Sequence, residues 1–116
     1  LMQYLLALYV DESGWGRMTP EQQKQGSAAY TAYTEDLRSA GALVPTTRLR
    51  PSGTATTLRT TNGKAQVLDG PFAESKEQLA GYYLIDVPDL DAAMQWAGRC
   101  PTAQHGIVEV RAIWPM

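Results

Sequence analysis

Three stretches of the chain carry apolar side chains at most positions, and each of them predicts a strand. They are residues 2–10, 79–87 and 107–114. The first is apolar on both faces, with Met2, Tyr4, Leu6, Leu8 and Val10 on one and Leu5, Ala7 and Tyr9 on the other. A strand of this kind needs cover on both sides. Helices of the same chain can cover one face, so we expect a second subunit to cover the other, in a homodimer.

A long helix is predicted from residue 20 to about residue 40. Thr19 is its expected N-cap, Pro20 suits the first helical position, and Gln22 completes a capping box. Gly41 is the expected left-handed stop. The inward stripe, at spacings of three and four, consists of Tyr30, Tyr33 and Leu37.

A second helix is predicted after Pro88, which ends the strand before it. Asp89 is the expected N-cap. The apolar stripe of this helix consists of Leu90, Ala93, Met94 and Ala97. Cys100 follows at the helix end, before Pro101, and is expected to be a small buried apolar side chain.

The middle of the chain predicts short strands and a tight hairpin. Residues 43–50 read as a strand that Pro45 interrupts, and residues 54–61 are rich in threonine. Asn62-Gly63 is a strong signal for a two-residue hairpin turn into residues 64–68. We expect this hairpin to face solvent in part.

The order of these elements predicts the fold class. Strand, helix, strand, hairpin, strand, helix and strand match the split βαβ pattern of a ferredoxin-like α+β domain, βαββαβ, with the hairpin inserted before the third core strand. A chain of 116 residues is expected to form a single domain over residues 1–116.

Composition and charge exclude several function classes. The net charge of −2 and the absence of a basic run argue against nucleic-acid binding. One cysteine permits no intrachain disulfide and no cysteine-based zinc site. No phosphate-binding loop, nucleophile elbow or paired-histidine motif is visible, so we expect no cofactor and no metal. Residues 1–10 are too short to span a bilayer and have no basic flank, which predicts a cytoplasmic protein without membrane contact.

Candidate acid–base residues are few. Asp69 opens an Asp-Gly-Pro turn and could act as a base, although an aspartate there has a complete structural role as well. His105 is the only histidine and precedes the last strand, where it could point into a cleft or be solvated. Tyr82 and Tyr83 point to opposite faces of one strand, so one of them is expected to face a cavity, where its phenol could donate to a carbonyl oxygen.

Candidate binding residues surround the same turn. Phe72, Glu74 and Lys76 follow it, and the two charged ones could equally form a solvated surface turn. Arg59 on the hairpin and Arg111 on the last strand could hold an anionic substrate. Glu109 and Arg111 share a face of that strand, which predicts an ion pair between them.

Two consecutive segments resemble the signature of the DGPF branch of YCII-related proteins. They are Asp69-Gly70-Pro71-Phe72 and Ala73-Glu74-Ser75-Lys76-Glu77-Gln78. The resemblance extends over essentially the whole chain and implies a dimeric α+β barrel. Related barrels include isomerases and a dehydrochlorinase of aromatic breakdown. The resemblance therefore implies a small-molecule-binding protein, with an isomerase- or lyase-type reaction on an oxygenated carbonyl compound.

Members of a narrower branch of that family carry a histidine on the first helix, paired with an aspartate. Residues 21–40 hold no histidine, so His105 with Asp69 would have to replace that pair. The alternative hypothesis is a non-catalytic dimeric binding or regulatory module. DGPF proteins are often encoded beside alternative sigma factors, and this implies a sigma-factor-linked protein partner.

Overall fold

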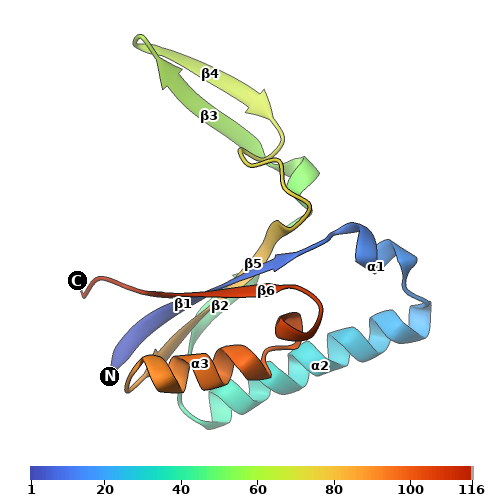
Figure 1. Cartoon of the computed structure of the whole chain (residues 1–116), viewed down its shortest axis with the longest axis vertical. Coiled ribbons are helices and arrows are strands. Elements are labelled where there is room, and N and C mark those ends of the chain that lie inside the picture. Colours follow the sequence, from blue (N-terminus) through green and yellow to red (C-terminus); the bar gives the residue numbers. More distant parts are fainter. Residues whose placement is uncertain (116) are drawn as a thin grey trace.

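The main sheet has four antiparallel strands in the order β2-β5-β1-β6 (Figure 1). They are β1 (Met2–Val10), β2 (Leu43–Arg48), β5 (Gln78–Val87) and β6 (Ile107–Ala112). This computed structural model describes residues 1–115, and among them the side chains of all but residues 45–47. The first and third core strands form the central pair, so the architecture is α+β and consistent with a ferredoxin-like fold.

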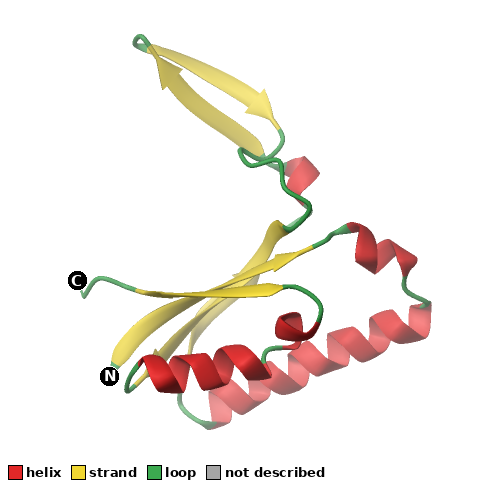
Figure 2. Cartoon of the chain, viewed as in Figure 1, coloured by secondary structure: helices red, strands yellow, loops and turns green. Residues whose placement is uncertain are grey.

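Two helices cover one face of this sheet (Figure 2). The longer is α2 (Pro20–Ser39), preceded by the short α1 (Ser13–Arg17). The Thr19 hydroxyl accepts from the Gln22 amide at 3.1 Å, and the Thr19 amide donates to the Gln22 side chain at 2.9 Å. Gly41 follows with φ 71°. The predicted capping box and the left-handed stop are both confirmed. In the described part of the chain, no helix is long and apolar enough to cross a membrane.

The second covering helix is α3 (Leu90–Arg99), followed by the 3₁₀ turn η2 (Pro101–Gln104). Asp89 caps it as predicted, accepting from the Ala92 amide at 2.9 Å. The predicted apolar stripe is wrong in part, because Leu90 and Met94 are each 52% exposed. The small side chains of Ala93 and Ala97 face the sheet instead, where they allow the helix to approach closely.

The core lies between this helical layer and the sheet. Its fully buried side chains include Leu6, Leu37, Ile85 and Cys100. Three hydroxyl contacts tie α2 to its neighbours: Tyr33 donates to the Trp96 carbonyl oxygen of α3 at 2.7 Å, Tyr83 of β5 contacts Thr34 at 2.8 Å, and Tyr30 contacts Thr102 of η2. Burial raises the pKa of all three tyrosine hydroxyls, so they stay neutral hydrogen-bonding groups.

The opposite face of the sheet has no helical cover (Figure 2). We call it the open face. The strand register places on it Leu5, Ala7, Tyr9, Leu79, Tyr82, Leu84, Ile107, Glu109 and Arg111. Most of these side chains are apolar, and Leu79 and Ile107 are 39% and 51% exposed. β1 is predicted to be apolar on both faces, and the helices cover only one of them. In a single chain, the apolar side chains on the other face are therefore left without helical cover (Figure 2).

A separate hairpin leaves the body of the molecule between β2 and β5. The strands β3 (Thr56–Thr61) and β4 (Lys64–Asp69) pair only with each other among the described strands. Asn62 and Gly63 both have positive φ, 51° and 76°, as the predicted two-residue turn requires. Figure 1 shows the hairpin standing away from the sheet, on the side opposite α2 and α3.

Two irregularities interrupt the pairing of the main sheet. The register of β1 against β5 shifts between Leu8 and Tyr9. The register of β2 against β5 shifts between Val44 and Thr47, an interval that includes the predicted break at Pro45. Such bulges bend a strand and redirect the side chains that follow.

Gly106, directly before β6, allows a close backbone contact that a larger residue would prevent. A Cβ atom there would lie 2.3 Å from the Tyr9 carbonyl oxygen, which is backbone and cannot move aside easily. Gly106→Ala should therefore lower the free energy of unfolding by about 2 kcal/mol or more. Denaturant unfolding measures this.

Gly98→Ala is the matched control for this substitution. Gly98 is exposed on α3, and nothing lies within 4 Å of its added Cβ. The Gly98→Ala substitution should raise the free energy of unfolding by up to about 1 kcal/mol. Equal effects of the two alanines would contradict the close contact.

Candidate functional site

A groove of about 660 Å³ lies on the open face, where β1 ends and β5 and β6 begin. Its floor is a row of three side chains, because Tyr9 pairs with Leu79 of β5 on one side and with Ile107 of β6 on the other. The segment after the hairpin forms its wall. The described lining is Tyr9, Pro71, Phe72, Ala73, Ser75, Glu77, Gln78, Leu79, Ile107 and Glu109.

The wall, which we call the groove loop (residues 71–77), is held by its own hydrogen bonds. The Gln78 side-chain amide donates to the carbonyl oxygens of Ala73 and Ser75, at 3.0 and 2.8 Å. Gln78 itself is the first residue of β5. The loop is therefore attached directly to the sheet that forms the groove floor.

Gly70 connects the groove loop to the hairpin. Its φ of 101° lies in the left-handed region that favours glycine. The Gly70 amide donates to the Ala55 carbonyl oxygen at 2.6 Å, and Thr57 donates to the Gly70 carbonyl oxygen at 2.7 Å. This turn joins the base of the hairpin to the groove loop within one short segment.

Five of the described lining side chains are polar, and three of them, Tyr9, Glu77 and Glu109, carry a phenol or a carboxylate. Tyr9 and Glu77 are partly buried, and neither has a hydrogen-bond or ion-pair partner within the described residues. Glu109 is paired with Arg111 at 3.1 Å, which confirms the predicted ion pair. A phenol and a carboxylate thus line an otherwise largely apolar hollow and remain available to a bound molecule.

None of the predicted acid–base residues belongs to the described lining of the groove. Asp69 is exposed at the end of β4, opposite Thr56 in the hairpin. His105 is exposed at the end of η2, two residues before β6. Tyr82 is partly buried on the open face, paired with Ala7 of β1.

The predicted binding residues are divided between the groove and the surface. Phe72 lines the groove and is 74% exposed. The Arg59 guanidinium lies over its ring, 5.5 Å from the ring centre. Arg111 is not in the described lining, but it forms an ion pair with Glu109, which is. Glu74 and Lys76 are exposed on the groove loop.

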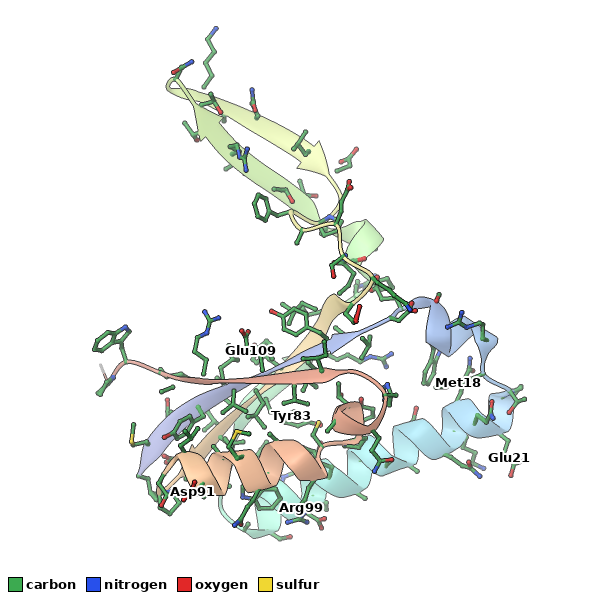
Figure 3. All side chains as sticks on the ribbon, viewed as in Figure 1. Met18, Glu21, Tyr83, Asp91, Arg99 and Glu109 are labelled. Atoms are coloured by element: carbon green, nitrogen blue, oxygen red, sulfur yellow. The ribbon has the colours of Figure 1, made fainter. Side chains whose placement is uncertain are left out.

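Tyr83 lies on the other side of the sheet. Figure 3 shows it between the sheet and the helices, whereas Glu109 stands on the open face. The Thr34 hydroxyl donates to the Tyr30 carbonyl oxygen, so Tyr83 donates to Thr34. Its hydroxyl is therefore committed to the core. Of the two adjacent tyrosines, Tyr82 faces the open side.

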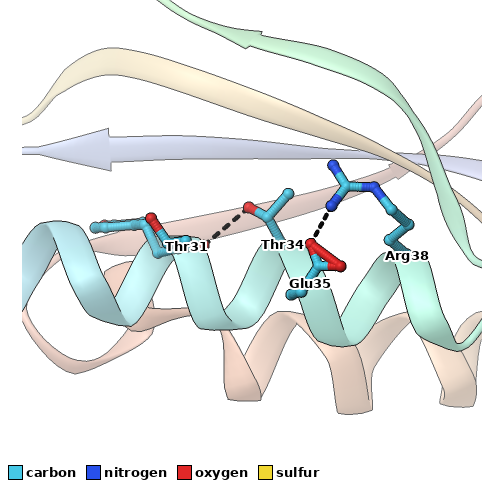
Figure 4. Close-up of a pocket in the computed structure, with 5 residues that line it drawn as sticks. Thr31, Thr34, Glu35 and Arg38 are labelled. Atoms are coloured by element: carbon cyan, nitrogen blue, oxygen red, sulfur yellow. Dashed lines mark hydrogen bonds and ion pairs between the residues drawn. The ribbon is translucent and has the colours of Figure 1, made fainter.

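A second hollow, of about 270 Å³, lies on α2 and is lined by Tyr30, Thr31, Thr34, Glu35 and Arg38 (Figure 4). Its charged groups form an ion pair with each other, Arg38 with Glu35, and Thr34 bonds to Tyr30 and Tyr83. Its polar groups are thus largely engaged within the chain. Within residues 1–115, no three of His, Cys, Asp and Glu gather into a metal-binding cluster.

Sequence reasoning missed Tyr9, Glu77 and Glu109 as groove residues. Tyr9 belongs to an apolar strand and reads as core, while Glu77 stands among other charged residues. The usable signal for Glu109 was its position, with Arg111, inside a strand whose other residues are apolar. For Glu77, it was the nearness of the loop to the start of β5, since strand ends form the rims of sheets.

Comparison with known proteins places the chain in a family. The model of the YCII-related domain matches residues 2–116. The chain belongs to the YCII-related family. It is also similar to an uncharacterized protein of Rhizobium meliloti (strain 1021), with 40% identity over 114 residues, which cover 97% of this chain and 92% of the relative. As a member of this family, the chain shares its scaffold with a relative of nearly the same length.

The single cysteine of this YCII-related protein is not a reactive group. Cys100 is fully buried at the end of α3, and burial raises the pKa of its thiol above the usual value. Native protein should react with a thiol reagent at pH 8 on the order of 100-fold or more slowly than the urea-unfolded chain. A rate like that of the unfolded chain would show that Cys100 is accessible.

Proposed function

We propose that this protein binds a small oxygenated carbonyl compound in the groove and moves a proton on it without a cofactor. The observation that carries this proposal is the presence of two available polar groups, Glu77 and Tyr9, in the lining of one largely apolar hollow. A carboxylate and a phenol in such surroundings supply a base and a hydrogen-bond donor.

The reaction needs no other reagent. Glu77 takes a proton from the carbon next to the carbonyl, and the electron pair of that C–H bond forms an enolate. The enolate oxygen accepts a hydrogen bond from the Tyr9 hydroxyl. Return of the proton from Glu77 to a different carbon completes an isomerisation. In an elimination, the enolate electrons form a C=C bond, a group on the neighbouring carbon leaves with its bonding electron pair, and this group takes up the proton from Glu77.

Arg59 is the proposed anchor for a carboxylate on the same molecule. Its guanidinium lies over the Phe72 ring, at the rim of the groove, and has no carboxylate partner among the described residues. A planar guanidinium can bind a carboxylate through two parallel hydrogen bonds. The preferred ligands are therefore acids that also contain a ketone or a lactone.

The functional unit we propose is a homodimer in which the open faces of two copies meet. An apolar sheet face with a largely apolar groove at one end is typical of a surface that a partner covers. Two sheets facing each other would also exclude water from the groove, which strengthens the interactions made there.

We assign the chain to the DGPF branch on the residues of the turn, Asp69-Gly70-Pro71-Phe72.

The wild-type protein should sediment at twice the mass of one chain at micromolar concentration. Leu84→Glu should shift it toward one chain, because it puts a charge at the centre of the open face, opposite Leu5 and Val44. Leu90→Glu makes the same chemical change on the exposed side of α3 and should leave the mass unchanged. A wild-type mass of one chain would refute the dimer.

Proton abstraction can be measured without knowing the product. In D₂O, the wild type should speed deuterium uptake next to the carbonyl of some member of a panel of keto acids and lactone acids, followed by proton NMR. E77Q should slow this exchange by about 100-fold or more and Y9F by about tenfold or more. E21Q, which removes a carboxylate from the first turn of α2, should have no effect.

Two results would contradict the catalytic proposal. One is exchange that survives E77Q. The other is a dimer that binds and exchanges no member of the panel, which would favour the alternative of a non-catalytic binding or regulatory module.

A further inference from the structure

The β3–β4 hairpin carries most of its apolar side chains on one face and its two basic side chains on the other. Leu58 pairs with Val67 across the two strands, and Thr60 pairs with Ala65 on the same side. The other side carries Arg59 and Lys64 together with Thr57, Thr61, Gln66 and Leu68, whereas Thr56 and Asp69 lie on the side of Leu58. Alternation of this kind is typical of a ribbon with one face packed against something.

Within the described part of a single chain, no residue covers that apolar face. Leu58 is 65% and Val67 is 64% exposed, and every residue of β4 is exposed. A two-stranded hairpin without packing is marginally stable in water. Its uncovered apolar side and its separation from the main sheet both indicate that a second surface supports it.

The hairpin stands on the same side of the molecule as the open face, opposite α2 and α3 (Figure 1). One chain therefore has two uncovered apolar surfaces, the open face and the Leu58–Val67 face of the hairpin. A second copy placed on the open face comes to lie beside the hairpin. A two-fold dimer can then cover the open face and the apolar face of the hairpin in the same step.

Charge favours a second copy as the occupant. Residues 56–69 of the hairpin hold two basic side chains and one acidic one, a net charge of +1, and the remaining residues hold eight basic and eleven acidic ones, a net charge of −3. The remainder of the chain is correspondingly acidic. A positively charged segment that reaches toward the acidic body of another copy is attracted to it, and this attraction steers association.

We propose that the hairpin is an arm that clasps the partner subunit of the dimer, with its face of Leu58, Ala65 and Val67 packed on that subunit. The inference rests on the proposed dimer. The arm ends at Asp69, and the groove lining begins at Pro71. Clasping therefore holds the groove loop, with its exposed Phe72, in place, and the groove is complete only in the dimer.

Sedimentation of two matched double variants tests the arm. L58E/V67E charges the apolar face, whereas T61E/Q66E adds the same two charges to the opposite face. All four positions are exposed, so the single chain should fold in both variants, as circular dichroism can verify. The first variant should weaken dimerisation by about tenfold or more, and the second by less than about twofold.

Hydrogen exchange of the wild type gives a second, independent readout. Amides of residues 56–69 should exchange about tenfold or more slowly above the dimer dissociation constant than below it. Equal dissociation constants for both variants, with exchange in the arm independent of concentration, would overturn the clasp and leave the dimer intact. A wild type that is monomeric throughout would overturn the dimer and the clasp together.

Discussion

The structure depends on a four-stranded sheet that its own helices cover on one side only. On the covered side, small residues of α3 and the hydroxyl contacts of Tyr30, Tyr33 and Tyr83 fix the helical layer. On the other side lie apolar residues of β1, β5 and β6 that a single chain leaves without helical cover. Burial of apolar surface is the main source of free energy in association. The proposed function therefore depends on which surface covers this face.

The site and the arm belong to one continuous segment of the chain. The hairpin ends at Asp69, Gly70 turns with positive φ, the groove loop follows, and Gln78 begins β5. The register shift after Leu8 lies beside this segment and coincides with the position of Tyr9 at the groove floor. A change in the position of the hairpin would therefore move the groove loop, because only Gly70 separates them. Dimerisation and the proposed binding site are linked in this way.

Local signals in the sequence predicted most of the fold. The Thr19 capping box, the Asp89 cap and the Asn62-Gly63 turn depend on neighbouring residues, so their chemistry is readable without tertiary structure. The groove was not readable in this way. Tyr9, Glu77 and Ile107 meet through strand register, which is non-local, and a bulge of one residue changes which side chains share a face. Similarly, the rotation of α3 that exposes Met94 depends on how closely Ala93 and Ala97 approach the sheet.

The central claim is that the open face is covered by a second copy, and a cysteine placed there tests it most directly. Leu5 lies on the central strand of that face, and the natural Cys100 is buried, so L5C would provide the reactive thiol. The account predicts that this thiol reacts about tenfold or more slowly in concentrated protein, and that the rate rises as dilution separates the subunits. A thiol that reacts equally fast at every concentration would contradict it.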